Sequence, residues 1–346
     1  MPRFSIPPPS IVAALVPNWL GDAAMCTPAL RALRRRFPEA RITALGRPGS
    51  IALLEDSPFI DDTAAVARGG GPLEWFRARG AWPHARPDLA VVFPHSARAA
   101  MTARVLGARH IAGYERGGRS WLLHHRLPPH RENGHIAPVY MAREYLELVE
   151  ALGAEDDGRG LELGVNPEAD AAVAPLLAGE GPLVGIAPGA AYGPSKRWLP
   201  ERYAAVADLL RERVNARPPL LTGPGEEDTR DAVLAASRHG LQLLEGPGSI
   251  ARLKAAISRL DLLIGNDSGP RHIAVAFGVP VVCIMGPTKP VYSCGPYEKG
   301  EVLRIDVYCG PCQRPTCATD HRCMTGIGVE TVANAAIAHL PRPVAG

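Results

Sequence analysis

Short apolar runs alternate with amphipathic segments along the chain. Residues 11–16, 41–46 and 88–93 are runs with the length of buried parallel strands. The segment between the first two runs has the spacing of an amphipathic helix. Its apolar face is formed by Cys26, Leu30, Leu33 and Phe37, and the opposite face carries Arg31, Arg34, Arg35 and Arg36. Strands that alternate with helices predict an α/β fold, with a parallel sheet covered on both faces.

The second half of the chain repeats this rhythm. It predicts strands at 183–188, 219–222, 241–244 and 261–265, with helices at 200–213, from about 226, and at 249–259. A chain of 346 residues is also long for a single core. Residues 153–182, rich in glycine and acidic side chains, separate the halves. We therefore expect two doubly wound domains, 1–165 and 166–346, facing each other across a cleft.

The composition argues against nucleic-acid-binding, membrane-spanning and secreted proteins. Charged residues make up 21% of the chain, and the formal net charge of +3 is too small to indicate a nucleic-acid partner. No run of about 20 apolar residues predicts a membrane span. Residues 1–10 lack the apolar core of a secretory signal, so we expect a cytoplasmic protein with reduced cysteines.

Three loops of the second half carry the chemistry of a phosphate site. Residues 189–198 follow a strand and contain Lys196 and Arg197, and residues 223–228 bring carboxylates that suit ribose hydroxyls. Residues 266–272 predict a turn and a helix N-terminus, which favours anions, with His272 one turn into the helix. Together they predict a site for a nucleoside diphosphate, and no dinucleotide or P-loop motif is present.

The loop after the first strand offers two interpretations. Asp22 stands where a helix N-cap is expected, a role that stabilises a helix by about 1 kcal/mol. It also follows the carboxyl end of a strand, where open α/β sheets bind ligands, so it can act as a catalytic base. Gly21 before it would let a substrate approach.

Residues 114–135 concentrate arginine and histidine between glycines and prolines. One reading is a solvated loop. The other is a surface for an anionic acceptor, with Arg116, Arg119 and Arg126 as phosphate or carboxylate forks. Residues 121–123 would be able to touch lipid.

Four cysteines lie close together near the C-terminus, at the spacing Cys309-x2-Cys312-x4-Cys317-x5-Cys323, with His321 nearby. A structural zinc ion or an iron–sulfur cluster would use such thiols. The spacing is not that of two C-x-x-C knuckles, so a reduced loop without metal is the alternative.

At these loops the sequence resembles a known family. Residues 18–30 (NWLGDAAMCTPAL) are similar to the opening motif of the ADP-heptose–lipopolysaccharide heptosyltransferases, glycosyltransferase family 9. Residues 188–198 (PGAAYGPSKRW) and 266–272 (NDSGPRH) resemble its donor-site motifs, and 286–288 its Gly-Pro-Thr turn. The form of the 192–198 segment resembles the heptosyltransferase II branch. The likeness implies a GT-B fold of two Rossmann-like domains and metal-independent inverting transfer.

The resemblance also implies roles for individual residues. Asp22 matches the general base, and Lys196 the lysine that faces the donor phosphates. The diphosphate loop is matched by Asp267, Ser268, Gly269 and His272. Gly189 and Ser195 belong to the donor loop. Glu226, in preference to Glu227, matches the ribose contact.

The implied reaction moves heptose from ADP-L-glycero-D-manno-heptose to the inner core of lipopolysaccharide, with residues 1–165 holding the acceptor and 166–346 the donor. It needs no cofactor. Its partners are an ADP-sugar and an anionic acceptor, and peripheral contact with the inner face of the inner membrane is expected. Two alternatives stay open: a related transferase that uses another NDP-sugar, and a non-catalytic nucleotide-sugar-binding module, which would keep Lys196 but not need Asp22.

Overall fold

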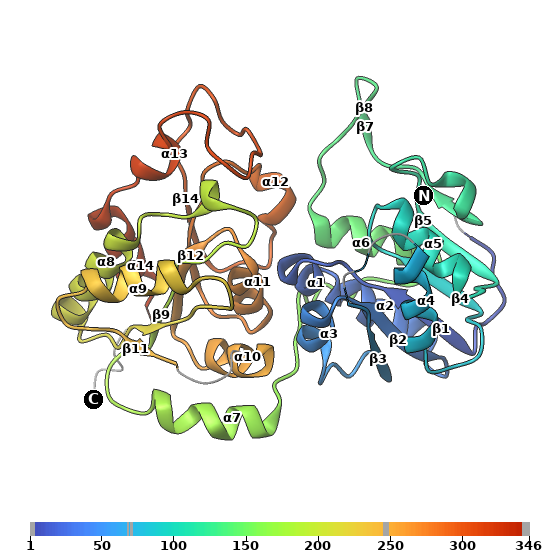
Figure 1. Cartoon of the computed structure of the whole chain (residues 1–346), viewed down its shortest axis with the longest axis horizontal. Helices are drawn as coiled ribbons and strands as arrows, with labels where there is room; N and C mark the ends of the chain where they lie inside the picture. The colour runs from blue at the N-terminus through green and yellow to red at the C-terminus, as the bar shows by residue number, and fades with distance from the viewer. Residues whose placement is uncertain (1–3, 68, 70–71, 245–248, 341–346) are drawn as a thin grey trace. The chain divides into compact units, whose positions relative to one another are not determined.

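Each half of the chain folds around a parallel six-stranded sheet (Figure 1). The computed structural model describes residues 4–67, 69, 72–244 and 249–340. It divides into two units, residues 1–164 and 165–346. Contiguous apolar runs form the central strands because both faces of each sheet are covered by helices. The predicted α/β fold with two doubly wound sheets is confirmed.

In unit 1 the strand order is β3-β2-β1-β4-β5-β6. These strands are β1 Ile11–Leu15, β2 Arg41–Gly46, β3 Asp62–Ala65, β4 Leu89–Val92, β5 His110–Tyr114 and β6 His125–Leu127. Because β1 lies between β2 and β4, the order reverses at β1. The carboxyl edge at such a reversal is where open α/β sheets place ligands.

Helices cover both faces of the unit 1 sheet. One group packs together, namely α1 Leu20–Met25, α2 Thr27–Arg36, α3 Pro48–Leu54 and α6 Met141–Glu150. On the other face, Ala13 and Leu15 of β1 share a buried apolar cluster with Ala78 and Ala100, which lie on α4 Pro72–Ala81 and α5 Ala97–Val105. The remaining short elements are η1 Ser120–Leu122, β7 Arg131–Glu132 and β8 His135–Ile136.

Unit 2 repeats the arrangement with the order β11-β10-β9-β12-β13-β14. Its strands are β9 Val184–Ala187, β10 Pro219–Leu220, β11 Gln242–Leu243, β12 Leu262–Asn266, β13 Val281–Ile284 and β14 Gly300–Leu303. Here the order reverses at β9, which pairs with β10 and β12. The loops that follow β9, β10 and β12 therefore meet at one edge of the sheet.

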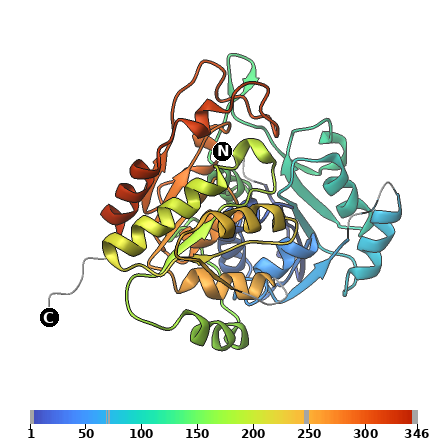
Figure 2. The ribbon, with the colours of Figure 1, turned by 60° about the vertical axis from the view of Figure 1, so that its left-hand side comes forward.

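The helices of unit 2 also form two groups. Val184 and Ile186 of β9 face a buried cluster with α8 Pro200–Val214 and α14 Val329–His339, which lie side by side in Figures 1 and 2. The helix α9 Glu227–Ala236 packs against α8. The second group comprises α7 Pro167–Val173, α10 Ile250–Ser258 and α11 Gly269–Ala276. The short elements are η2 Ala174–Leu177, η3 Pro194–Lys196, α12 Pro290–Ser293 and α13 Arg322–Thr325.

The helix after β1 differs from the prediction. It is broken at Cys26 into α1 and α2, and Trp19, not Asp22, occupies the N-cap position of α1. Pro28 lies in the first turn of α2, where its missing N–H costs least, so a new helix begins there. Asp22 lies in the first turn of α1, and the N-cap interpretation is wrong.

Two further segments have contacts that the sequence did not predict. Arg31, on the arginine face of α2, is 3% exposed and bonds Asp157 at 2.7 Å and Glu162 at 3.3 Å. It thereby fastens α2 to the segment that leaves unit 1. Residues 114–135 are not one loop, because β6 adds to the sheet edge and β7 pairs with β8.

Candidate active site

The edge of unit 2 where the strand order reverses brings three of the predicted loops together. They follow β9, β10 and β12 and contain Lys196, Glu226 and Asp267. Lys196 Nζ donates to the Asp267 carboxylate at 2.8 Å and to its backbone carbonyl at 2.9 Å. These two residues are 71 positions apart in the sequence. An ammonium has three N–H donors, so one is left to meet an anion at this edge.

Asp267 is the centre of a charged network. Its carboxylate also accepts from Arg271 at 2.8 Å and from the Thr288 hydroxyl at 2.7 Å. Burial by itself would raise the pKa of Asp267, but Lys196 and Arg271 outweigh burial and hold this pKa far below its usual range. Asp267 therefore stays ionised and orients the lysine.

Arg271, which the sequence did not single out, is 1% exposed. Its guanidinium forms two bonds of 2.6 Å with Glu298, in the loop before β14. This fork fixes the first turn of α11 against the loop before β14. Glu298 lies 27 residues further along the chain, so no local motif points to the pair.

The start of α11 has the features of an anion site. Ser268 occupies the N-cap position with extended backbone, and Gly269 is the first helical residue. Among the described residues, the buried Ser268 hydroxyl oxygen has no hydrogen-bond partner. His272 is 5% exposed, and burial together with Arg271 lowers its pKa to about 3. His272 is thus neutral at physiological pH, and the positive field comes from the helix and Lys196.

Asn266 ties the loops in place. The sequence predicted it as part of a turn, but it is the last residue of β12 and is fully buried. Its amide donates to the Pro188 carbonyl at 2.7 Å, and its oxygen accepts from Trp198 N–H at 3.1 Å and Tyr203 hydroxyl at 2.9 Å. The β9 loop is therefore fixed to the end of β12.

Glu226 and Glu227 differ in environment. The Glu226 carboxylate lies against Gly189, where an added Cβ would come within 1.9 Å of its oxygen, so a larger residue at 189 would push the carboxylate out of this position. It accepts from Gly223 N–H at 2.9 Å, and burial raises its pKa. Glu227 is exposed and bonds the Gly225 N–H of its own turn. Of the two, Glu226 is the carboxylate at the edge that carries Lys196.

Ser195 has a supporting contact. It is 2% exposed, and its hydroxyl donates to the Arg314 carbonyl at 2.5 Å. Its N–H donates to the Pro315 carbonyl at 3.0 Å, and Tyr192 donates to Gln313 at 2.5 Å. The cysteine-rich segment 309–323 therefore braces the loop that carries Lys196.

The four clustered cysteines line one cavity of about 260 Å³, with His321 at its wall. His321 bonds the Ser195 carbonyl at 2.8 Å. Across the described ranges, no group of three or more His, Cys, Asp or Glu side chains is placed to hold a metal ion. A structural metal at Cys309, Cys312, Cys317 and Cys323 stays a prediction.

In unit 1, Asp22 and Gly21 lie half-buried in the first turn of α1, after the carboxyl end of β1. Burial raises the pKa of Tyr145, and the negative charge of Asp22 raises it further, as it does for Cys26. Asp22 therefore lies at the strand-order reversal of unit 1, near the buried Tyr145 of α6.

The three predicted acceptor arginines are in different environments. Arg116 pairs with Glu144 at 2.6 Å. Arg119 is fully buried, and its guanidinium donates to the carbonyls of Pro94, Tyr114 and Ser96, so it holds the loops after β4 and β5 instead of forming part of a surface. Arg126 is exposed.

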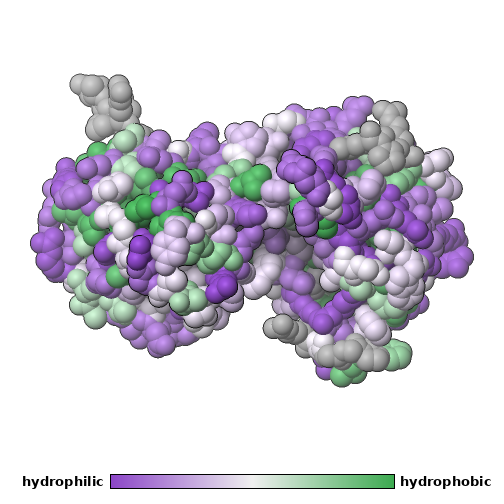
Figure 3. Space-filling model, turned by 90° about the horizontal axis from the view of Figure 1, so that it is seen from above, coloured by the Kyte–Doolittle hydropathy of each residue, from purple (hydrophilic) through white to green (hydrophobic). Residues whose placement is uncertain are grey.

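One face of the molecule and the 121–123 segment show how exposed apolar side chains are distributed. The face shown in Figure 3 is mostly hydrophilic, with apolar residues in small separate patches. In the 121–123 segment only Trp121 is exposed, at 67%, whereas Leu122 and Leu123 are buried. Within the described residues, no helix is long and apolar enough to cross a membrane.

Comparison with known proteins identifies the family. Residues 84–322 match the model of glycosyltransferase family 9 (heptosyltransferase). The chain is 26% identical to lipopolysaccharide heptosyltransferase 2 of Escherichia coli, covering 85% of this chain and 88% of that protein. It is 27% identical to lipooligosaccharide heptosyltransferase 2 of Haemophilus influenzae, with coverages of 84% and 87%.

Two solved structures have the same fold. A family 9 glycosyltransferase from Veillonella parvula aligns with a TM-score of 0.80 and 23% identity, over 95% of this chain and 97% of that one. The ADP-heptose lipopolysaccharide heptosyltransferase II of Escherichia coli aligns with a TM-score of 0.76 and 24% identity, over 95% and 98%.

Proposed function

Because the chain belongs to glycosyltransferase family 9, we propose that it moves heptose from ADP-L-glycero-D-manno-heptose to the inner core of lipopolysaccharide, with inversion at the anomeric carbon. Several relatives at about 25% identity over most of the chain carry the name heptosyltransferase 2, which supports this donor and acceptor class. The observation that carries the proposal is the Lys196–Asp267 pair beside the start of α11, on the edge that also holds Glu226.

Unit 2 holds the donor in this proposal. Lys196 and the N–H groups at the start of α11 face the diphosphate, and the Glu226 carboxylate accepts from the ribose hydroxyls. As the sugar–phosphate bond breaks, negative charge grows on the leaving ADP. Lys196 and the helix N-terminus stabilise that charge, so the reaction needs no metal or other cofactor.

Unit 1 holds the acceptor and supplies the base. Asp22 accepts the proton of the acceptor hydroxyl while its oxygen bonds to the anomeric carbon from the face opposite ADP. As that bond forms, the sugar–phosphate bond breaks with its electron pair going to ADP, and inversion follows from this single displacement. A carboxylate placed just after the carboxyl end of β1 suits this step.

A donor screen tests the proposal. Purified protein is incubated with a defined inner-core acceptor and one NDP-sugar at a time, including ADP-heptose, ADP-glucose and the UDP- and GDP-sugars, and products are weighed by mass spectrometry. We expect a mass gain of one heptose with ADP-heptose only. Transfer from a different NDP-sugar would replace the donor assignment, and nucleotide-sugar binding without transfer would favour a non-catalytic module.

We also propose that the protein works in the cytoplasm at the inner face of the inner membrane. The support is the lipid-linked nature of the proposed acceptor and the exposed Trp121, since indole side chains favour membrane interfaces. Sedimentation with anionic phospholipid vesicles measures this contact. Trp121→Ala should reduce the bound fraction, and equal binding by the variant would contradict the role of this side chain.

A further inference from the structure

A second pocket lies within unit 1, at the carboxyl edge of the sheet. Its wall includes Val16 and Asn18 after β1, Arg47 after β2, and Ser96 and Arg98 after β4. It therefore lies at the reversal of strand order, which is the usual ligand position in such sheets. Its volume is about 70 Å³, whereas one water needs roughly 10–15 Å³ on this measure. A small chemical group fits there.

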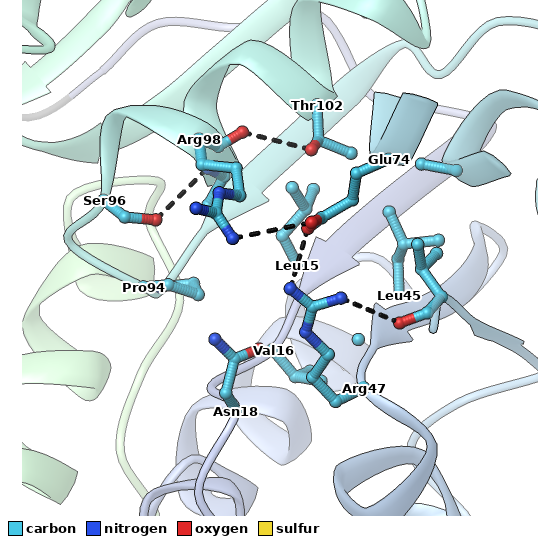
Figure 4. A pocket seen from close by; sticks show the side chains of 14 residues that line it. Leu15, Val16, Asn18, Leu45, Arg47, Glu74, Pro94, Ser96, Arg98 and Thr102 are labelled. Atoms are coloured by element: carbon cyan, nitrogen blue, oxygen red, sulfur yellow. Dashed lines mark hydrogen bonds and ion pairs between the residues drawn. The ribbon is translucent and has the colours of Figure 1, made fainter. Parts of the chain in front are cut away.

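Two arginines converge on one carboxylate in this pocket (Figure 4). Arg47 donates to Glu74 at 2.8 Å and to the Val66 carbonyl at 3.1 Å. Arg98 reaches the other oxygen of Glu74 at 3.5 Å, a long contact that a bound anion would readily replace. The Glu74 side chain is 8% exposed, so it is a fixed anchor between the two guanidinium groups.

The balance of charge and donors favours an anion. The charged residues that line the pocket are Arg47, Arg98 and Glu74, which leave one net positive charge. A guanidinium has five N–H donors, and the described contacts use two from Arg47 and one from Arg98. The exposed amide of Asn18 lies at the same pocket, so further neutral donors are available. Arginine forks of this kind suit carboxylate and phosphate groups.

We propose that the Arg47–Arg98 pocket binds a carboxylate or phosphate group of the acceptor. This inference rests on the proposed function, because it takes the acceptor to be anionic. Asn18 is four residues before Asp22, and both follow β1. An acceptor anchored there by its anionic group keeps a neighbouring hydroxyl near the catalytic base. Glu74 is a positioning residue, since it orients both arginines.

Substitution of Arg98 tests the pocket with the full-length protein. Arg98 is half exposed and makes one long ion pair, so Arg98→Gln leaves the fold intact. We expect the KM for the acceptor to rise about tenfold, the low end for loss of a charge-assisted contact, with the KM for the donor unchanged. Arg98→Lys should recover part of the loss. Arg79→Gln, on the exposed face of α4, is the matched control and should match the parent.

Modified acceptors identify the anionic group. If the tenfold penalty disappears with an acceptor stripped of its phosphates, the pocket binds phosphate. If it disappears when the acceptor carboxyls are reduced to alcohols, the pocket binds carboxylate. A penalty that persists with an acceptor lacking both groups would overturn the inference. So would an Arg98→Gln variant whose KM for the acceptor equals that of a parent that transfers sugar.

Failure of the proposed function gives a different result. If the parent transfers no sugar from any donor, the acceptor glycan is titrated into the parent and into the Arg98→Gln variant by calorimetry. Binding that is about tenfold weaker in the variant supports the anion pocket without transfer. Equal binding to both proteins overturns the pocket.

Discussion

Replacing Lys196 by methionine removes a charge and keeps an aliphatic side chain of similar length. Two of the three ammonium donors of Lys196 bond Asp267, and the third is the one we assign to the donor diphosphate. The substitution should therefore weaken binding of ADP, which carries phosphates, and leave binding of adenosine, which carries none, nearly unchanged.

The structure sets the size of the effect. Lys196 is 14% exposed, so its contact with phosphate is only weakly screened by solvent. Loss of one charge-assisted contact costs about 1.5–3 kcal/mol, which corresponds to ADP binding that is about 10- to 150-fold weaker. Adenosine binding should change less than about twofold, since adenosine has no phosphate and so loses no charged contact with Lys196.

A second consequence concerns stability. Asp267 loses one cation but keeps Arg271 and Thr288, so its pKa rises toward the usual range. Removing one partner of a buried pair costs about 3–5 kcal/mol, and the remaining partners place this case at the low end. The melting temperature should fall, and binding has to be measured well below it.

Calorimetry with ADP and with adenosine is the assay, and Lys299→Met is the matched control. Lys299 is exposed and precedes β14, and its carbonyl accepts from Val281 at the start of β13. The Lys299→Met substitution thus removes the same charge at the opposite edge of the same sheet. Equal losses for ADP and adenosine in the Lys196 variant would refute the phosphate role, and so would a loss of ADP affinity in the Lys299 variant of the same size.

Four further outcomes follow from the site. Asp22→Asn should abolish transfer and leave the ADP affinity unchanged; substantial turnover would remove Asp22 as the base. Glu226→Gln should weaken binding of ADP but not of 2′,3′-dideoxy-ADP, and equal losses would contradict the ribose contact. The buried His272 has a pKa of about 3 against about 6.5 in an unfolded chain, so the unfolded state binds the proton first as pH falls. The free energy of unfolding should therefore drop by about 1.6 kcal/mol between pH 6.5 and pH 5. In urea titrations, the unfolding free energy of a His272→Asn variant should depend less steeply on pH. The same dependence as in the parent would contradict the role of His272. The double substitution Cys312→Ser and Cys317→Ser should lower the melting temperature and weaken ADP binding, because the cysteine-rich segment braces the Lys196 loop. If elemental analysis finds no zinc or iron and the variant melts like the parent, the thiols have no structural metal role.

The sequence alone determined the architecture and the loops that carry chemistry. Strands buried on both faces appear as contiguous apolar runs, and the run at 41–46 became β2 with the same bounds. Because parallel strands end at one edge, motifs that follow strands could be assigned to one site from the sequence alone. Shorter strands such as β3 and β6 were missed, because exposed polar residues interrupt their patterns.

Only the tertiary structure decided which side chains meet. Arg119 and Arg31 look like surface charges in the sequence, yet burial and distant partners make them internal fasteners. Arg271 finds Glu298, and Arg47 finds Glu74, through the crossing of separate loops. Local periodicity records which face of an element is apolar, but a charged side chain's partner depends on how distant elements pack. For that reason the anion pocket of unit 1 became visible only in the folded chain.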